Sequence, residues 1–225
     1  MSILAIVGVI VSSTAMFVVL SGFSGLKNYS LEFISFVSPE IKITPTKGKS
    51  FVFTDKIKSF LKNENIYYGL SYEDKALLSV NENTRIVKVR GVDQFFPKKS
   101  IDSMIYQGLW FGKGSEEIVV GLGAAYDLGI STFDAISPIK LYAPKPGKGQ
   151  VFSEKDVLRS INVLASGIFS LNEDLNNSLV LCDIELAKKL FELKNNEVGS
   201  IDIYDTDGSL EKITSFFGPQ FSVET

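Results

Sequence analysis

The chain has 225 residues, of which 45% are hydrophobic, and its formal net charge is −3. This charge gives no electrostatic basis for binding nucleic acid. The absence of histidine excludes Ser–His and Cys–His nucleophile pairs, and the single cysteine excludes an internal disulfide.

The first feature along the chain is an uncharged apolar segment at residues 3–26. Its polar members are small hydroxyls, which can donate a hydrogen bond to the preceding helical turn. At about 1.5 Å per residue, such a helix crosses the ~30 Å hydrocarbon layer. We therefore predict one transmembrane helix. Because no basic residue precedes this segment, we also expect the chain to begin inside the helix, as a fragment of a longer protein would.

Two alternatives compete with the transmembrane prediction. A secretory signal peptide normally begins with basic residues, and none precedes this segment. A buried core helix is usually shorter and has a polar face.

Beyond the span, apolar residues continue at helical spacing, and Pro39 is expected to end the helix. This pattern predicts an amphipathic stalk. Residues 1–38 are thus interpreted as transmembrane helix and stalk, and residues 39–225 as one globular domain.

The globular part shows a mixture of strand and helix patterns. Apolar runs predict strands at residues 40–45, 66–72, 76–80, 84–92, 117–120, 136–142, 161–169, 179–182, 198–204 and 220–223, with a hairpin turn at 81–83. Helical spacing predicts helices after Thr54 or Asp55 and at residues 104–110, 122–128, 184–193 and 210–217, and Gly129 is expected to close the third of these. This order predicts an α+β fold with mixed strand pairing.

Two glycine motifs could be taken for phosphate-binding loops. Gly121 and Gly123 resemble part of a dinucleotide fingerprint, but Tyr126 stands at the third glycine position, so we predict a plain strand-to-helix turn. The segment at residues 112–115 lacks the spacing of a phosphate loop and is predicted to be an ordinary loop.

The remaining chemical candidates are weak. Asp205, Asp207 and Gly208 predict a turn, because the distal glutamate of a cation loop is absent. Cys182 is predicted to be a small core residue. The acidic pairs are interpreted as solvated loop charges: Glu116, Glu117, Glu173 and Asp174. The sequence predicts no catalytic residue, no cofactor and no metal site.

Several segments, in order, resemble lipoprotein-releasing ABC transporter permeases (the LolC/LolE family). VVLSGFSGLKNYSLEFISFVSPEIKI (residues 18–43) is similar to the end of the family's first membrane helix, its stalk and its first strand. The correspondence continues through VKVRGVD (87–93), EEIVVGLGAAYDLGI (116–130), PIKLYAP (138–144), NVLASGIF (162–169) and LVLCDIELAKKLF (179–191). Phe133-Asp134 stands where the family usually has Gly-Asp.

The resemblance implies a transmembrane helix in the bacterial inner membrane, followed after about residue 39 by a periplasmic α+β domain of the MacB-like type. It implies a non-catalytic subunit whose partners are separate cytoplasmic ATPase subunits, a second permease subunit (the same chain or a different one), a lipoprotein substrate and a periplasmic carrier. The stalk residues Phe23, Leu26, Tyr29 and Phe33 would pack on the partner subunit or line the path of the acyl chains among membrane lipid.

The insertion at residues 144–159 is the implied partner-binding element, because lipoprotein-releasing permeases carry a protruding hook there that grips the carrier. Its residues alone favour an ordinary solvated loop; the resemblance implies a hairpin arm with a local charge of +2, from four basic against two acidic residues. Phe152 would be the anchor. The implied partner-binding residues are Pro144, Lys145, Pro146, Lys148, Val151, Phe152 and Lys155.

Three alternative functions stay open. MacB-like efflux permeases use the same domain organisation. FtsX-like cell-division permeases transport nothing and activate cell-wall hydrolases. An unrelated adhesion or receptor domain is the third class.

Overall fold

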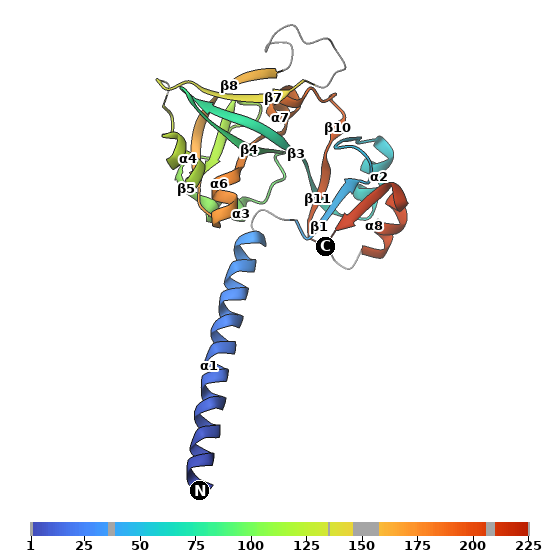
Figure 1. Cartoon of the computed structure of the whole chain (residues 1–225). Coiled ribbons are helices and arrows are strands. Elements are labelled where there is room, and N and C mark those ends of the chain that lie inside the picture. Colours follow the sequence, from blue (N-terminus) through green and yellow to red (C-terminus); the bar gives the residue numbers. More distant parts are fainter. Residues whose placement is uncertain (1, 36–38, 135, 146–157, 206–209, 225) are drawn as a thin grey trace.

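The computed structural model describes the chain except residues 1, 36–38, 135, 146–157, 206–209 and 225, and it describes residues 2, 4, 27–35, 98 and 205 by their backbone alone. An extended N-terminal helix, α1 (Ser2–Ser35), precedes a mixed α+β domain (Figure 1). This order of elements confirms the fold class expected from the sequence.

Helix α1 contains a segment, Ala5–Leu26, that is long and apolar enough to cross a membrane, and no residue of its most apolar stretch is buried by the rest of the described chain. The core-helix alternative is therefore wrong. As expected, hydroxyl side chains donate hydrogen bonds to carbonyls of the preceding turn: Ser13 Oγ donates to Val9 O at 2.6 Å and Thr14 Oγ1 to Ile10 O at 2.8 Å.

The domain consists of strands, often two in succession, separated by short helices. The strands are β1 (Ile41–Pro45), β2 (Phe51–Val52), β3 (Tyr67–Val80), β4 (Asn83–Val92), β5 (Ile105–Gly108), β6 (Glu117–Gly121), β7 (Ile139–Pro144), β8 (Leu158–Phe169), β9 (Leu179–Asp183), β10 (Glu197–Val198), β11 (Ser200–Asp205) and β12 (Phe221–Glu224). The helices are α2 (Asp55–Asn63), α3 (Lys98–Met104), α4 (Leu122–Leu128), α6 (Glu173–Ser178), α7 (Ile184–Phe191) and α8 (Leu210–Phe217), with a 3-10 turn at Gly218–Gln220.

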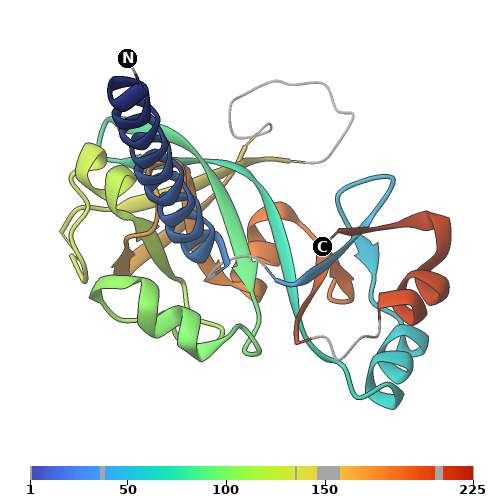
Figure 2. The same ribbon diagram turned by 90° about the horizontal axis from the view of Figure 1, so that it is seen from below.

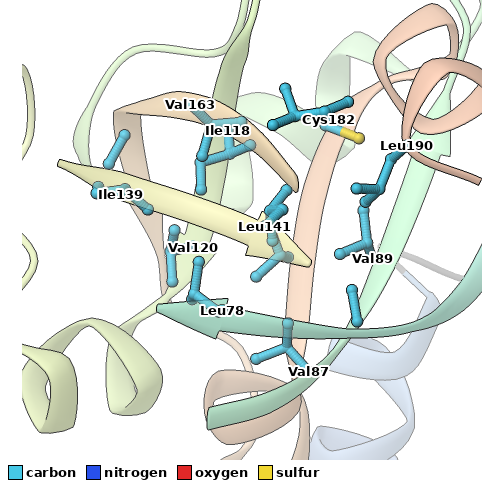
Figure 3. Packing of buried hydrophobic residues seen from close by; sticks show 14 of the residues in the cluster. Leu78, Val87, Val89, Ile118, Val120, Ile139, Leu141, Val163, Cys182 and Leu190 are labelled. Carbon is cyan, nitrogen blue, oxygen red and sulfur yellow. The ribbon is translucent and has the colours of Figure 1, made fainter. Parts of the chain in front are cut away.

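The larger lobe is a closed ring of strands. The pairings run β3–β4–β9–β6–β8–β7 and return to β3, because β7 pairs with both β8 and β3. Alternate residues of these strands point inward and form the main core, including Leu78, Val89, Ile118 and Leu141 (Figure 3). Helices α4 and α7 contribute buried residues to this core. On the outer face of the ring, a second apolar cluster packs beneath α3 and α6.

The smaller lobe extends the same sheet. Strands β12, β1 and β11 follow on from β3, and they pack with α2 and α8 around a third apolar cluster (Figure 2). Strand β3 therefore belongs to both lobes: its first half pairs with β11, and its second half lies in the ring.

A buried polar chain joins the lobes across β3. The Arg90 guanidinium on β4 donates to Asp202 on β11 at 2.7 Å, and both side chains are almost fully buried. Ser200 Oγ donates to the other Asp202 oxygen at 2.7 Å. Because the single Ser200 hydroxyl proton is used there, Ser71 must donate the 2.7 Å bond that links the two serines.

Asp93, directly after β4, holds the next loop against β3. Its carboxylate accepts from the Leu70 amide at 2.9 Å and from the Phe95 amide at 3.0 Å. Burial, together with the nearby charges of Asp202 and Asp183, raises the pKa of Asp93 to about 6 despite these two bonds.

Local signals predicted several boundaries correctly. Thr54 caps α2, Gly129 closes α4 in the left-handed conformation, and Asn81 (φ 53°) lies in the β3–β4 turn. The predicted strands 66–72 and 76–80 are one continuous strand, β3.

Other boundaries were predicted wrongly. The helix predicted at 104–110 is wrong: Met104 ends α3, and β5 follows because its backbone pairs with β8. Ile136 lies outside β7, which begins at Ile139. Helix α7 ends before residue 193, because Glu192 adopts φ 57°.

Asp202→Ala is expected to lower the free energy of unfolding by about 3–5 kcal/mol, because it leaves the buried Arg90 charge without its carboxylate. The double variant Arg90→Met/Asp202→Leu should recover most of this loss. Urea denaturation of the domain measures both. Lys212→Ala, which removes the exposed ion pair to Glu64, is the control and should cost under about 1 kcal/mol. A loss below about 1 kcal/mol for Asp202→Ala would contradict this role.

Asp93→Asn is expected to remove part of the pH dependence of stability. A carboxyl whose pKa is raised in the folded state binds its proton more tightly there than in the unfolded chain. Its contribution therefore favours folding at low pH and is lost as pH rises from about 4 to above 6. Relative to Asp93→Asn, the wild-type free energy of unfolding should fall by about 2 kcal/mol over this range. Denaturant titrations at a series of pH values measure the difference, with the exposed Asp102→Asn as a control. A pH-independent difference between wild type and Asp93→Asn would count against the assignment.

Candidate partner-binding site

The base of the predicted arm is a β-hairpin. Strands β7 and β8 pair antiparallel from Ile139 opposite Val163 to Pro144 opposite Leu158. Figure 1 shows these strands on the side of the larger lobe that faces away from α1. Pro144 and Lys145 are exposed at the end of this pairing. The other predicted arm residues lie outside the described residues: Pro146, Lys148, Val151, Phe152 and Lys155.

Arg159 fastens the hairpin to α7. Its guanidinium donates to the Lys189 carbonyl at 2.7 Å and forms an ion pair with Glu192, the residue that ends the helix. Arg159 was counted among the basic charges of the arm, but its charge is matched by Glu192. The net positive charge that the arm can offer a partner is therefore smaller than the +2 counted from the sequence. The same contacts hold the base of the hairpin against α7.

A polar groove of about 460 Å³ lies beside this contact. Lys188 crosses part of it, donating to Glu185 at 2.9 Å and to the Asn195 carbonyl at 3.0 Å. Lys189 pairs with Glu116, the residue before β6. The groove suits a polar protein surface, because basic and acidic side chains both line it. It is lined by Arg159, Glu185, Lys188, Lys189, Glu192, Leu193 and Asn195.

Sequence reasoning missed this groove and the role of α7. Its residues come from β8, α7 and the following turn, and no local pattern brings them together. The only available signal was the amphipathic pattern of α7, which predicted a helix with an exposed charged face.

The Gly121–Gly123 motif is a packing device. A Cβ atom at Gly121 would lie 2.4 Å from the Asn176 carbonyl oxygen, and one at Gly123 would lie 2.1 Å from Asn177 Oδ1. The two glycines let α4 pack closely against α6, so the predicted strand-to-helix turn is confirmed. Gly91 similarly allows α7 to pack closely against β4, since a Cβ at this position would lie 2.4 Å from Ala187 Cβ.

The acidic residues singled out in the sequence have structural roles. Glu117 accepts from the Gly112 amide at 2.8 Å and from Ser115 Oγ at 2.9 Å, which orders the predicted 112–115 loop. Glu116 pairs with Lys189. Glu173 and Asp174 were predicted to lie in a loop, but they occupy the first turn of α6, where carboxylates complement the helix dipole.

Among the described residues, no group of three or more Cys, Asp or Glu side chains is placed to hold a metal ion. Asp205 ends β11, and the rest of the predicted turn, including Asp207 and Gly208, lies outside the described residues. Cys182 points into the ring core, as predicted, and burial raises the pKa of its thiol well above the usual range (Figure 3).

The predicted stalk residues lie along the outer part of α1. Phe23 and Leu26 are exposed, 69% and 63% respectively. Tyr29 and Phe33 lie on the continuous helical backbone, and their side chains lie outside the description. Exposed apolar side chains on this helix are available to lipid or to a partner helix.

No protein-family model and no curated protein matches this sequence. Solved structures do match the fold. The periplasmic region of MacB from Actinobacillus actinomycetemcomitans aligns with a TM-score of 0.54 and 11% identity, covering 82% of this chain and 87% of that one. The extracellular domain of the noncanonic ABC-type transporter YknZ from Gram-positive bacteria aligns with a TM-score of 0.52 and 10% identity, covering 82% and 99%. These likenesses confirm the MacB-like α+β fold expected for the domain that follows α1.

Proposed function

We propose that this chain supplies the first membrane helix and the outward-facing domain of an ABC-type permease. The observation that carries the proposal is the fold shared with the MacB and YknZ domains over 82% of the chain. The exposed apolar helix α1 supports it, because such a helix in front of this domain anchors it to a membrane. Residues after about 39 then lie in the periplasm, with α1 in the inner membrane.

The subunit acts mechanically in this proposal. ATP is hydrolysed by separate cytoplasmic ATPase subunits, and a second permease subunit completes the membrane path. Movement of α1 reaches the domain through β1, the first strand after the helix. The stalk face at Phe23, Leu26, Tyr29 and Phe33 contacts the second subunit or the acyl chains of the cargo.

We further propose that the cargo is a lipoprotein, which is extracted from the inner membrane and passed to a soluble periplasmic carrier. The order of sequence motifs shared with lipoprotein-releasing permeases supports this choice over efflux. The hairpin base supports it as well: Arg159 anchors β8 on α7 beside a polar groove, which suits an arm that must resist the pull of a bound carrier.

Replacing residues 145–152 by a short Gly-Ser link, or changing Phe152→Ala, is expected to weaken carrier binding at least tenfold, about 1.4 kcal/mol. The reason is that binding energy concentrates in a few large buried side chains. Carrier affinity and lipoprotein release are measured on the permease reconstituted with its ATPase in vesicles. Tyr126→Ala, which removes an aromatic side chain that is 86% exposed on α4, is the matched control and should leave both unchanged.

Unchanged carrier affinity together with unchanged release in the trimmed variant would contradict the carrier-binding arm. That result would favour the MacB-like efflux or FtsX-like signalling alternatives.

A further inference from the structure

Two neighbouring segments at the end of the larger lobe carry four exposed apolar side chains. Tyr106 and Leu109 come from β5 and the residue after it, and they are 67% and 65% exposed. Phe133 and Ile136 come from the segment between α4 and β7, and they are 49% and 92% exposed. These four residues are called the β5 surface below.

Backbone hydrogen bonds hold the two segments side by side. The Leu109 amide donates to the Ser166 carbonyl and the Phe133 amide to the adjacent Ala165 carbonyl, each at 2.8 Å. Strand β8 has a register shift at this point, so the carbonyls of two consecutive residues accept hydrogen bonds from the two segments. Gln107 Nε2 also donates to Thr132 Oγ1 at 3.3 Å.

Asp134 also bonds to the backbone of the second segment. Asp134 Oδ1 accepts from the Ile136 amide at 2.8 Å. The apolar side chains are therefore presented to solvent from a bonded backbone. Such an arrangement suits an interface, because little conformational freedom remains to be lost on binding.

The size of the β5 surface fits a self-association. Its four side chains expose on the order of 500 Å². Two copies packed face to face would bury about 1,000 Å², the lower limit for a specific interface. Two copies anchored in one membrane also meet at a raised effective concentration, so an interface of this size is sufficient.

The position of the β5 surface fits a partner of the same orientation. Copies held in one membrane by α1 can be related only by an axis along the membrane normal, so their contact must lie at the side of the domain. Strand β5 and α4 lie at the end of the domain opposite α2 and α8 (Figure 1). Seen from the α1 side, α1 runs in front of the larger lobe and away from α2 and α8 (Figure 2).

We propose that the β5 surface binds the same surface of a second copy of this chain. This contact would bring the two α1 helices toward each other beneath the paired larger lobes. The inference rests on the proposed function, which requires two permease subunits, and it names the face through which they meet outside the membrane.

Cysteine cross-linking of the full chain in membranes tests the proposal. The native Cys182 is fully buried, so it gives no background. Leu109→Cys and Phe133→Cys are treated with a short bismaleimide. Val52→Cys is the matched control, since Val52 is 52% exposed in the smaller lobe. We expect the yield of cross-linked dimer from Leu109→Cys or Phe133→Cys to exceed that from Val52→Cys at least tenfold.

Equal yields at all three positions, no dimer at the β5 surface, or cross-links from it to a different protein would each overturn the inference. Cargo release is measured on the same membranes, with the ATPase subunits present. Release without cross-linking at the β5 surface overturns this inference alone. Cross-linking there without release supports the interface and counts against the proposed function.

Discussion

The structure depends on one strand shared by two lobes. Strand β3 contributes its first half to the smaller lobe and its second half to the closed ring. The buried ion pair between Arg90 and Asp202 crosses β3 and ties β4 to β11. Because a buried charge is costly unless its partner stays in place, the two lobes cannot separate without breaking this pair. The domain therefore behaves as one body in which relative motion of the lobes is resisted.

Strand pairings connect the first strand of the domain to its far side. Strand β1 is the first strand after α1, and it pairs with β11. Strand β11 pairs with β3, and β3 pairs with β7, which carries one side of the hairpin. A displacement of α1 would thus reach the hairpin base through three consecutive strand pairings. Arg159 adds a side-chain connection from the hairpin to α7, so the base of the proposed arm moves with the ring.

Features set by neighbouring residues could be predicted from the sequence. The cap at Thr54, the left-handed Gly129 and the turn at Asn81 each follow from the conformational preference of one residue in its local setting. Features set by distant residues could not. Segment 105–108 became a strand because β8 offers it backbone partners, and the ring closes because β7 meets β3 some sixty positions away.

The candidate site divides in the same way. The position of the insertion between two strands followed from the order of the motifs, and β7 and β8, which flank it, pair with each other. The pairing of Arg159 with Glu192 depends on where α7 packs against the ring, which the sequence does not encode locally. The glycine motif is explained by packing. Gly121 and Gly123 lie so close to α6 that any added side chain would collide with it, so phosphate binding is not needed to account for them.

We propose that α1 holds the domain on the outer side of a membrane. Labelling of Val52→Cys by a membrane-impermeant maleimide in spheroplasts tests it most directly, since the native Cys182 is buried and silent. We expect full labelling before the cells are lysed, with the labelled chain retained in the membrane fraction. Labelling that appears only after lysis, or recovery of the labelled chain as a soluble protein without α1, would contradict it.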